Sequence, residues 1–290
     1  MLLLGLLWFA PLHAENSRCL LWEVQGEYNT LYLLGSIHMM REEDYPLDSC
    51  VDDAYQKSAS LVVELDIQSI EPQEMSQKMQ QFGLLPVGET LAEQLSTETL
   101  KLLSQYSALP ANYQQMRPWY LALTITLQKL SELGYRFDLG VDNYLISKAQ
   151  GIKPIISLET LDQQLAVLAG DNREEQDLSL RLTLEKMSET ASDISEMNRA
   201  WHQGDAAVIY RLMASPKQHY PQLAAPFDRL VVQRNRQMAD KIVLLLEEAG
   251  DHLVVIGAGH LGGEEGVIAL LEKRGLTLIQ QPKLGRSMLY

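Results

Sequence analysis

Two segments near opposite ends of the chain share one pattern, a short apolar run that ends in Gly-x-x-His. The first covers residues 30–38 and the second covers residues 252–260. Each run is typical of a buried β-strand that stops at a glycine, with a histidine just beyond the stop. Because distant parts of the sequence present His38 and His260 in the same way, we expect both imidazoles at one edge of one sheet.

Two further apolar runs end in carboxylates. Residues 60–66 read Ser-Leu-Val-Val-Glu-Leu-Asp, and residues 153–160 read Lys-Pro-Ile-Ile-Ser-Leu-Glu-Thr. Runs rich in Val and Ile without polar alternation are typical of parallel strands that are covered on both faces. Helical patterns separate the runs, so the sequence predicts an α/β fold with a mixed, largely parallel central sheet flanked by helices. The expected connecting helices cover residues 47–58, 142–150, 233–249 and 266–274, and a last strand covers residues 276–280.

The middle of the chain is helical in pattern. Periodicity of the helical kind dominates from about residue 71 to 135 and again from about residue 161 to 228. We interpret both stretches as a large helical insertion that forms a lid or wall beside the sheet, within one domain over residues 15–290. The clearest helices are expected over residues 91–106, 119–133 and 178–191.

Composition excludes some partners. The chain has 290 residues, 46% of them hydrophobic and 21% charged, which is typical of a globular protein. Its formal net charge is −14, whereas binding to nucleic acid or anionic lipid requires concentrated Lys and Arg. Neither class of partner is therefore expected.

The first residues and the cysteines indicate export. Residues 1–14 combine a short apolar stretch with Ala14 as a plausible cleavage residue, so we expect a signal peptide, with a retained anchor or a core segment as alternatives. No later run reaches the roughly 18 apolar residues of a membrane span. Cys19 and Cys50 are the only cysteines, and in a periplasmic or secreted bacterial protein such a pair favours a disulfide over two free thiols. Closing this loop would contribute about 3 kcal/mol.

The strand ends carry residues suited to a metal site. In open α/β sheets, ligands bind beyond the carboxyl ends of the strands, so we expect the side chains that follow the four runs to converge. Two histidines and a carboxylate suit a first-row divalent ion that keeps open positions for water and substrate. Such an ion lowers the pKa of bound water and polarises a carbonyl group. The predicted metal ligands are His38, Glu64, Glu159 and His260.

These side chains also have structural interpretations. Glu64, inside an apolar run, is alternatively half of a buried salt bridge with Arg234 or Arg236. Glu159 is alternatively a residue of a helix N-terminus, and Asp66 a helix cap. Arg234, at the start of a long helix, is either solvated or able to hold a carboxylate or stabilise an oxyanion.

The glycines of the two motifs have a predicted purpose. Gly35 and Gly257 are expected to let the backbone turn sharply at the strand ends, and Gly259 to remove a side chain beside His260.

The order of several motifs resembles the TraB/GumN family, which is related to the Tiki metalloproteases and more distantly to erythromycin-esterase-like and haem-binding ChaN-like folds. The matching segments cover residues 20–24, 32–38, 45–47, 62–66, 133–134, 140–142, 157–160, 164, 234–236 and 257–260. The resemblance implies a mixed α/β core whose active centre consists of two Gly-x-x-His motifs and a glutamate, matched here by His38, His260 and Glu64. It also implies peptide cleavage that depends on a divalent metal, with manganese or cobalt more typical than zinc. Since no C-terminal membrane span follows, the chain is most similar to the exported bacterial GumN-like branch.

The predicted function is a metal-dependent hydrolase, in the first place a peptidase, that uses Mn, Co or Zn on a peptide or protein substrate. His38 and His260 would bind the ion, Glu64 would complete the site or act as a base, and Arg234 would stabilise developing negative charge. Two alternatives stay open. One is a non-catalytic protein that binds a peptide, a metal or haem, and the other is a metal-free esterase with a histidine base.

Overall fold

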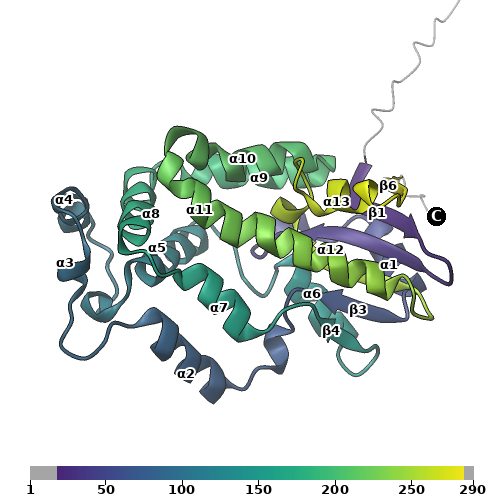
Figure 1. The fold of residues 1–290 in the computed structure, drawn as a ribbon, viewed down its shortest axis with the longest axis horizontal. Helices are drawn as coiled ribbons and strands as arrows, with labels where there is room; N and C mark the ends of the chain where they lie inside the picture. The colour runs from purple at the N-terminus through teal and green to yellow at the C-terminus, as the bar shows by residue number, and fades with distance from the viewer. Residues whose placement is uncertain (1–17, 284–290) are drawn as a thin grey trace, which may run out of the picture.

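The computed structural model describes residues 18–283, so the predicted signal peptide lies outside the described residues (Figure 1). Within this range six strands form one sheet in the order β4-β3-β5-β2-β1-β6. The strands are β1 (Arg18–Gln25), β2 (Thr30–Ser36), β3 (Ser60–Val63), β4 (Ile155–Ser157), β5 (His252–Gly257) and β6 (Leu278–Pro282). β4, β3, β5 and β2 are parallel, whereas β1 runs antiparallel to both β2 and β6. The predicted mixed, largely parallel sheet is confirmed.

The register of the sheet places the two Gly-x-x-His motifs side by side. Gly35 of β2 lies opposite Ile256 of β5, and Ser36 lies opposite Gly257. On the other side of β5, Val63 of β3 lies opposite Val255. All three strands are buried along their length, which explains why their sequences are apolar without alternation.

Helices cover the sheet and also extend well beyond it. In Figure 1, α1, α6, α12 and α13 surround the sheet, whereas α2 to α5, α7 and α8 extend away from it. The α-helices are α1 (Ser49–Lys57), α2 (Pro72–Gly83), α3 (Leu91–Gln94), α4 (Thr97–Gln105), α5 (Pro118–Glu132), α6 (Val141–Ala149), α7 (Leu161–Ala169), α8 (Arg173–Glu185), α9 (Thr190–Gln203), α10 (Ala206–His219), α11 (Ala224–Phe227), α12 (Arg234–Leu245) and α13 (Val267–Lys273). A π-helix (Asp228–Gln233) leads directly into α12, and 3-10 turns lie at Glu42–Asp44, Ile67–Ser69, Tyr113–Gln115, Pro221–Leu223 and Ala258–His260.

The helical extension has apolar clusters of its own. Leu121 and Ile125 of α5 pack in a cluster with Leu180 of α8, separate from the main core around the sheet. A third cluster joins Trp119 of α5 to Leu161 of α7. Helices α2 to α5, α7 and α8 of the stretches expected over residues 71–135 and 161–228 therefore form a packed unit of their own. Helices α9 and α10, which lie in the second stretch, pack on the main core instead through Ala200, Trp201 and Ile209.

Two predicted helices are each divided in the structure. The helix expected over residues 91–106 breaks into α3 and α4 because the Ser96 hydroxyl accepts a hydrogen bond from the Thr99 N–H and so caps a new helix. The helix expected over residues 178–191 is also interrupted, since α8 ends at Glu185 and α9 begins at Thr190.

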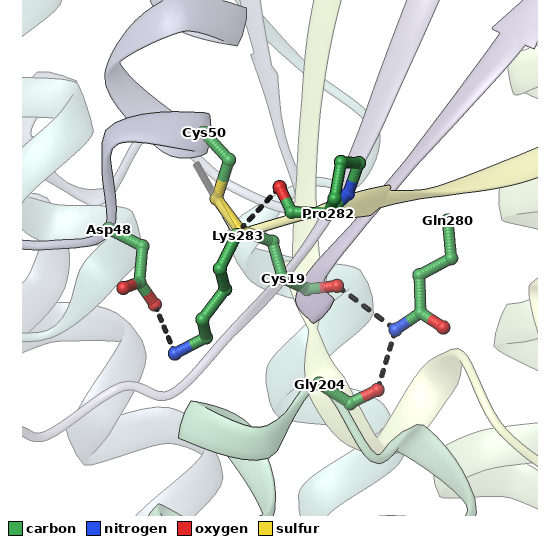
Figure 2. Close-up of a disulfide and its surroundings, with 7 residues drawn as sticks. All are labelled: Cys19, Asp48, Cys50, Gly204, Gln280, Pro282 and Lys283. Carbon is green, nitrogen blue, oxygen red and sulfur yellow. Dashed lines mark hydrogen bonds and ion pairs between the residues drawn. A yellow bond between two sulfur atoms is a disulfide. The ribbon is translucent and has the colours of Figure 1, made fainter. Parts of the chain in front are cut away.

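The predicted disulfide between Cys19 and Cys50 is present and joins strand β1 to helix α1. Cys19 of β1 and Cys50 of α1 are bonded, with their Cα atoms 6.7 Å apart (Figure 2). Beside the bridge, Lys283 forms an ion pair with Asp48 at 2.7 Å. None of the helices between residues 18 and 283 is long and apolar enough to cross a bilayer.

The chain does turn directly after Gly257, where the 3-10 turn Ala258–His260 begins, but the motif glycines are not left-handed. Gly35, Gly257 and Gly259 all have negative φ, so no left-handed turn occurs at these positions. Space is the constraint instead. A Cβ on Gly35 would lie 2.5 Å from Leu20, and a Cβ on Gly259 would lie 1.8 Å from the Met213 sulfur.

Candidate active site

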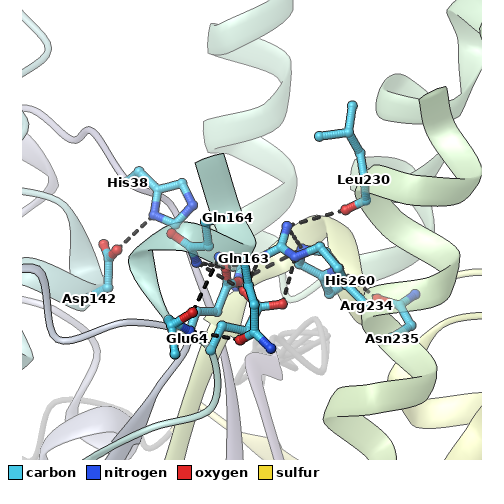
Figure 3. Close-up of polar contacts among 12 residues, drawn as sticks. His38, Glu64, Asp142, Gln163, Gln164, Leu230, Arg234, Asn235 and His260 are labelled. Atoms are coloured by element: carbon cyan, nitrogen blue, oxygen red, sulfur yellow. Dashed lines mark hydrogen bonds and ion pairs between the residues drawn. The ribbon is translucent and has the colours of Figure 1, made fainter. Parts of the chain in front are cut away.

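The structure brings the five predicted site residues together at the carboxyl edge of the parallel strands. Glu64 directly follows β3, His38 lies two residues after β2, and Glu159 lies two residues after β4. His260 ends the 3-10 turn that follows β5, and Arg234 is the first residue of α12. Figure 3 shows Asp142 beside His38 on one side of this cluster and Asn235 beside His260 on the other.

His38 is anchored by a carboxylate. Its Nδ1 lies 2.7 Å from Oδ2 of Asp142, the second residue of α6. The Asp142 carboxylate raises the pKa of the His38 imidazole above its ordinary value of 6.5. The His38 side chain is 57% exposed, and the bond at Nδ1 leaves Nε2 available to a ligand.

His260 is anchored by an amide. Its Nδ1 lies 2.6 Å from Oδ1 of Asn235, while Nδ2 of Asn235 donates to the Glu265 carbonyl oxygen at 2.7 Å. The bond to Glu265 fixes the amide orientation, so Oδ1 accepts the imidazole Nδ1–H. Burial lowers the pKa of His260 to about 4, despite the neighbouring Glu64 carboxylate. The ring is therefore neutral at pH 7, with a lone pair on Nε2.

The Glu64 carboxylate interacts electrostatically with both histidines. Its Oε1 accepts the Gly257 N–H at 2.6 Å and lies 3.8 Å from His260 Nε2, and its Oε2 accepts from Arg234 Nη2 at 2.6 Å. Burial opposes the charged form, but the neighbouring groups outweigh it and lower the pKa of Glu64 to about 2. Because His260 is neutral at pH 7, the cations that stabilise this charge are Arg234 and the His38 imidazole, whose pKa is raised to about 9.

Arg234 joins two buried carboxylates. Its Nε and Nη2 donate to the two oxygens of Glu159 at 2.8 and 2.7 Å, in the bidentate geometry typical of strong pairs. Its Nη1 donates to the Leu230 carbonyl oxygen and to His260 Nε2, each at 3.2 Å. Glu64 therefore forms the buried salt bridge that was one interpretation of it, with Arg234 as the partner, and it also belongs to the site.

Arg236 and Asp66 do not take part in the cluster. Arg236 points elsewhere and pairs with Glu265 at 3.3 Å, with 57% of its side chain exposed. Asp66 precedes the 3-10 turn at Ile67–Ser69, but its side chain makes no capping hydrogen bond.

Gly257 marks the point at which the site side chains meet. An ideal Cβ on this residue would lie 3.2 Å from Glu64 Oε1, 3.5 Å from His260 Cδ2 and 3.7 Å from His38 Nε2. A side chain here would enter the space between the two imidazoles and the carboxylate. The second motif therefore needs glycine at this position for access rather than for a turn.

The donors fit a divalent ion in type and in anchoring. Metal-binding histidines usually donate their second ring N–H to an oxygen acceptor, as both His38 and His260 are placed to do. In the structure, however, no three His, Cys, Asp or Glu side chains within residues 18–283 lie close enough together to hold a metal ion. Arg234 bonds His260 Nε2, so an ion would have to take that position from its guanidinium. Arg234 engages both oxygens of Glu159 but only Oε2 of Glu64, whose Oε1 lies 3.8 Å from His260 Nε2. This leaves His38, Glu64 and His260 as the donor set.

A cavity of about 390 Å³ opens in front of Glu64. Its polar wall lies at the sheet edge, and its remaining walls come mainly from α2, α5 and α7. His260 is 6% exposed and does not line the cavity. The polar lining consists of Ser36, His38, Glu64, Asp142, Gln164 and Arg234.

Comparison with known proteins places the fold and its motifs in a family. A profile of the TraB/PrgY/gumN family matches residues 20–280, nearly all of the described chain. The chain belongs to the TraB/PrgY/gumN family. It is 28% identical to the uncharacterized protein YbaP of Escherichia coli over 83% of this chain and 87% of that protein. It is 22% identical to an uncharacterized protein of Treponema pallidum over 92% of this chain and 84% of that protein. No solved structure matches the chain.

Two residues of the site, Asp142 and Asn235, were not predicted from the sequence to be site residues. Asp142 and Asn235 hold the two histidines, yet in the sequence each is simply part of a conspicuous motif, Gly140-Val-Asp142 and Arg234-Asn235-Arg236. A carboxylate or amide that orients a histidine carries no spacing rule, because the contact is made across elements.

Proposed function

We propose that this TraB/PrgY/gumN family protein is a metal-dependent hydrolase that cleaves peptide bonds. His38, Glu64 and His260 would hold a divalent ion, with manganese, cobalt and zinc as the candidates. The observation that carries the proposal is the matched anchoring of two imidazoles beside one carboxylate. Each ring is fixed through Nδ1 by an oxygen acceptor. Nε2 of His38 would lie 3.7 Å from a Cβ on Gly257, and Nε2 of His260 lies 3.8 Å from Oε1 of Glu64.

The ion and three side chains have separate roles in the proposed reaction. When bound, the ion would activate water and polarise the substrate carbonyl. Glu64 suits a ligand better than a general base, because a carboxylate with a pKa of about 2 accepts protons poorly at neutral pH. Arg234 lines the cavity and offers a fixed cation to negative charge that develops on the carbonyl oxygen. Glu159 keeps that cation in place.

The proposed place of action is the periplasm or the outside of the cell. The Cys19–Cys50 disulfide supports it, since such bonds persist in oxidising compartments.

The test measures metal binding and cleavage separately. Protein purified without a histidine tag is stripped with a chelator, titrated with Mn²⁺, Co²⁺ and Zn²⁺ by calorimetry, and assayed on a peptide library. We expect His38→Ala and His260→Ala each to weaken metal binding by at least about 100-fold and to abolish cleavage. His219→Ala, at an exposed site at the end of α10, is the matched control and should change neither. Wild-type cleavage by the double variant His38→Ala/His260→Ala would refute the proposal.

One contact favours a metal-free alternative. Arg234 Nη1 already occupies the lone pair of His260 Nε2 at 3.2 Å. A metal-free esterase would keep its activity after chelation, whereas a non-catalytic binder would take up ligand without turnover. Chelation followed by addition of metal therefore separates the three possibilities.

A further inference from the structure

The cavity in front of Glu64 is polar at one end only. Beyond the sheet edge its walls are apolar side chains of three helices, Met75 and Met79 of α2, Leu123 and Leu127 of α5, and Leu161 and Leu165 of α7. Among its lining residues, the ionisable ones all belong to the polar end at the strand termini. Its volume of about 390 Å³ falls in the range of small-molecule sites.

The helical walls cannot hydrogen-bond a peptide. Within α2, α5 and α7, backbone N–H and C=O groups bond to one another along the helix axis. A peptide brings one N–H and one C=O per residue into the cavity, and both would be buried without a partner. A hydrocarbon chain brings no such groups, so these walls suit it far better.

The rim and the polar end fit the two ends of such a ligand. Leu127, Phe137 and Leu168 line the cavity although 40%, 46% and 41% of their surface is exposed, so apolar surface continues to the mouth. At the other end, the buried Ser36 hydroxyl lines the cavity and has no hydrogen-bond partner within residues 18–283. A polar head group at this end would give it one.

We propose that the cavity binds the hydrocarbon chain of an acylated amide, with the acyl carbonyl at the polar end beside Ser36, His38 and Glu64. This inference rests on the proposed hydrolase function and narrows its substrate from peptide bonds in general to the amide bond between an acyl chain and the nitrogen of an amino acid or peptide. In the reaction, water adds its hydroxyl to the acyl carbon, the C–N bond breaks, and the nitrogen leaves with a proton. The products are a fatty acid and a free amine.

The test uses a series of N-acyl glycinamides with acetyl, octanoyl and dodecanoyl chains. Affinity is measured by calorimetry on the metal-free and the metal-loaded protein, and hydrolysis is followed by release of glycinamide. We expect affinity to rise about fourfold for each methylene group that is buried. Leu127→Gln and Leu168→Gln should each weaken dodecanoyl binding by about tenfold and leave acetyl binding unchanged. Leu244→Gln, at a 59% exposed leucine of α12 outside the cavity, is the matched control.

The outcomes separate this inference from the proposed function. Affinity that rises with chain length while no amide is hydrolysed would refute the hydrolase and leave the chain-binding cavity standing. Hydrolysis at a rate independent of chain length would support the hydrolase and refute the binding of a hydrocarbon chain in the cavity. Tighter binding of a leucine-rich hexapeptide than of the dodecanoyl amide, or equal effects of Leu168→Gln and Leu244→Gln, would overturn the assignment of the cavity to a hydrocarbon chain.

Discussion

Replacing Arg234 by methionine tests whether one guanidinium holds the candidate site together. Methionine keeps much of the apolar stem but removes the cation that bonds Glu64 at 2.6 Å and Glu159 at 2.7 Å. All three side chains are at least 86% buried, so the variant leaves two carboxylates in a dry environment without their partner. Removing one member of a buried ion pair costs about 3–5 kcal/mol, and we expect a loss of about 4 kcal/mol in the free energy of unfolding at pH 7.

The pH dependence gives this prediction a second readout. In the wild-type protein the folded-state pKa of Glu64 is lowered, so its stabilising contribution is present above pH 4.5 and is lost as pH falls toward about 2. Without Arg234, we expect burial to raise the pKa of Glu64 above its ordinary value of 4.5. The destabilising effect of its buried charge is then full at pH 7 and diminishes as pH falls through the raised value.

Urea denaturation at pH 7 and pH 5 provides the assay. Arg236→Met is the matched control, because Arg236 lies two residues away, is exposed and should contribute under about 1 kcal/mol. The reasoning would be refuted if Arg234→Met cost no more than Arg236→Met. It would also be refuted if the loss were as large at pH 5 as at pH 7.

Three further predictions concern other contacts. Cys19→Ser/Cys50→Ser should lower the free energy of unfolding by about 3 kcal/mol, because the bridge closes a loop with a sequence separation of 31; a loss under about 1 kcal/mol in urea denaturation would contradict this. In metal-free protein, Asp142→Asn should return the pKa of His38 toward 6.5, as read from an NMR titration of the imidazole; an unchanged pKa would show that another group sets it. Gly257→Ala should leave the melting temperature within a few degrees of wild type but weaken Mn²⁺ binding at least about tenfold, since its methyl group enters the space between the ligands; unchanged affinity measured by calorimetry would place the ion elsewhere.

The convergence of the strand ends was predictable because the pattern is local. Each buried strand is a short apolar run, and the next chemically useful residue follows within a few positions, as with Glu64 after β3 and His38 after β2. Once the strands are parallel neighbours, those residues must share an edge. The register of the sheet then sets these residues at the same height, because the ends of β2 and β3 both pair with the end of β5.

The partners of these residues were not predictable in the same way. The choice between Arg234 and Arg236 depends on the rotation of α12 about its axis, and a π-helix at Asp228–Gln233 shifts that rotation just before the helix begins. Periodicity taken from the sequence alone assumes 3.6 residues per turn and misses such a shift. The division of the helix at Ser96 was readable in principle, since a serine before Thr-x-Thr is a capping signal.

The strands that deliver the site come from both ends and the middle of the chain, with His38 early, Glu159 central and His260 late. A partly folded state that lacks any one of β2, β3, β4 and β5 cannot present the complete set, so recognition at this edge requires all four parallel strands in place. A compound that binds there stabilises the native state over every partly folded one, and it raises the melting temperature further as its concentration rises above its dissociation constant. Screening by thermal shift can therefore find ligands of this protein without a turnover assay.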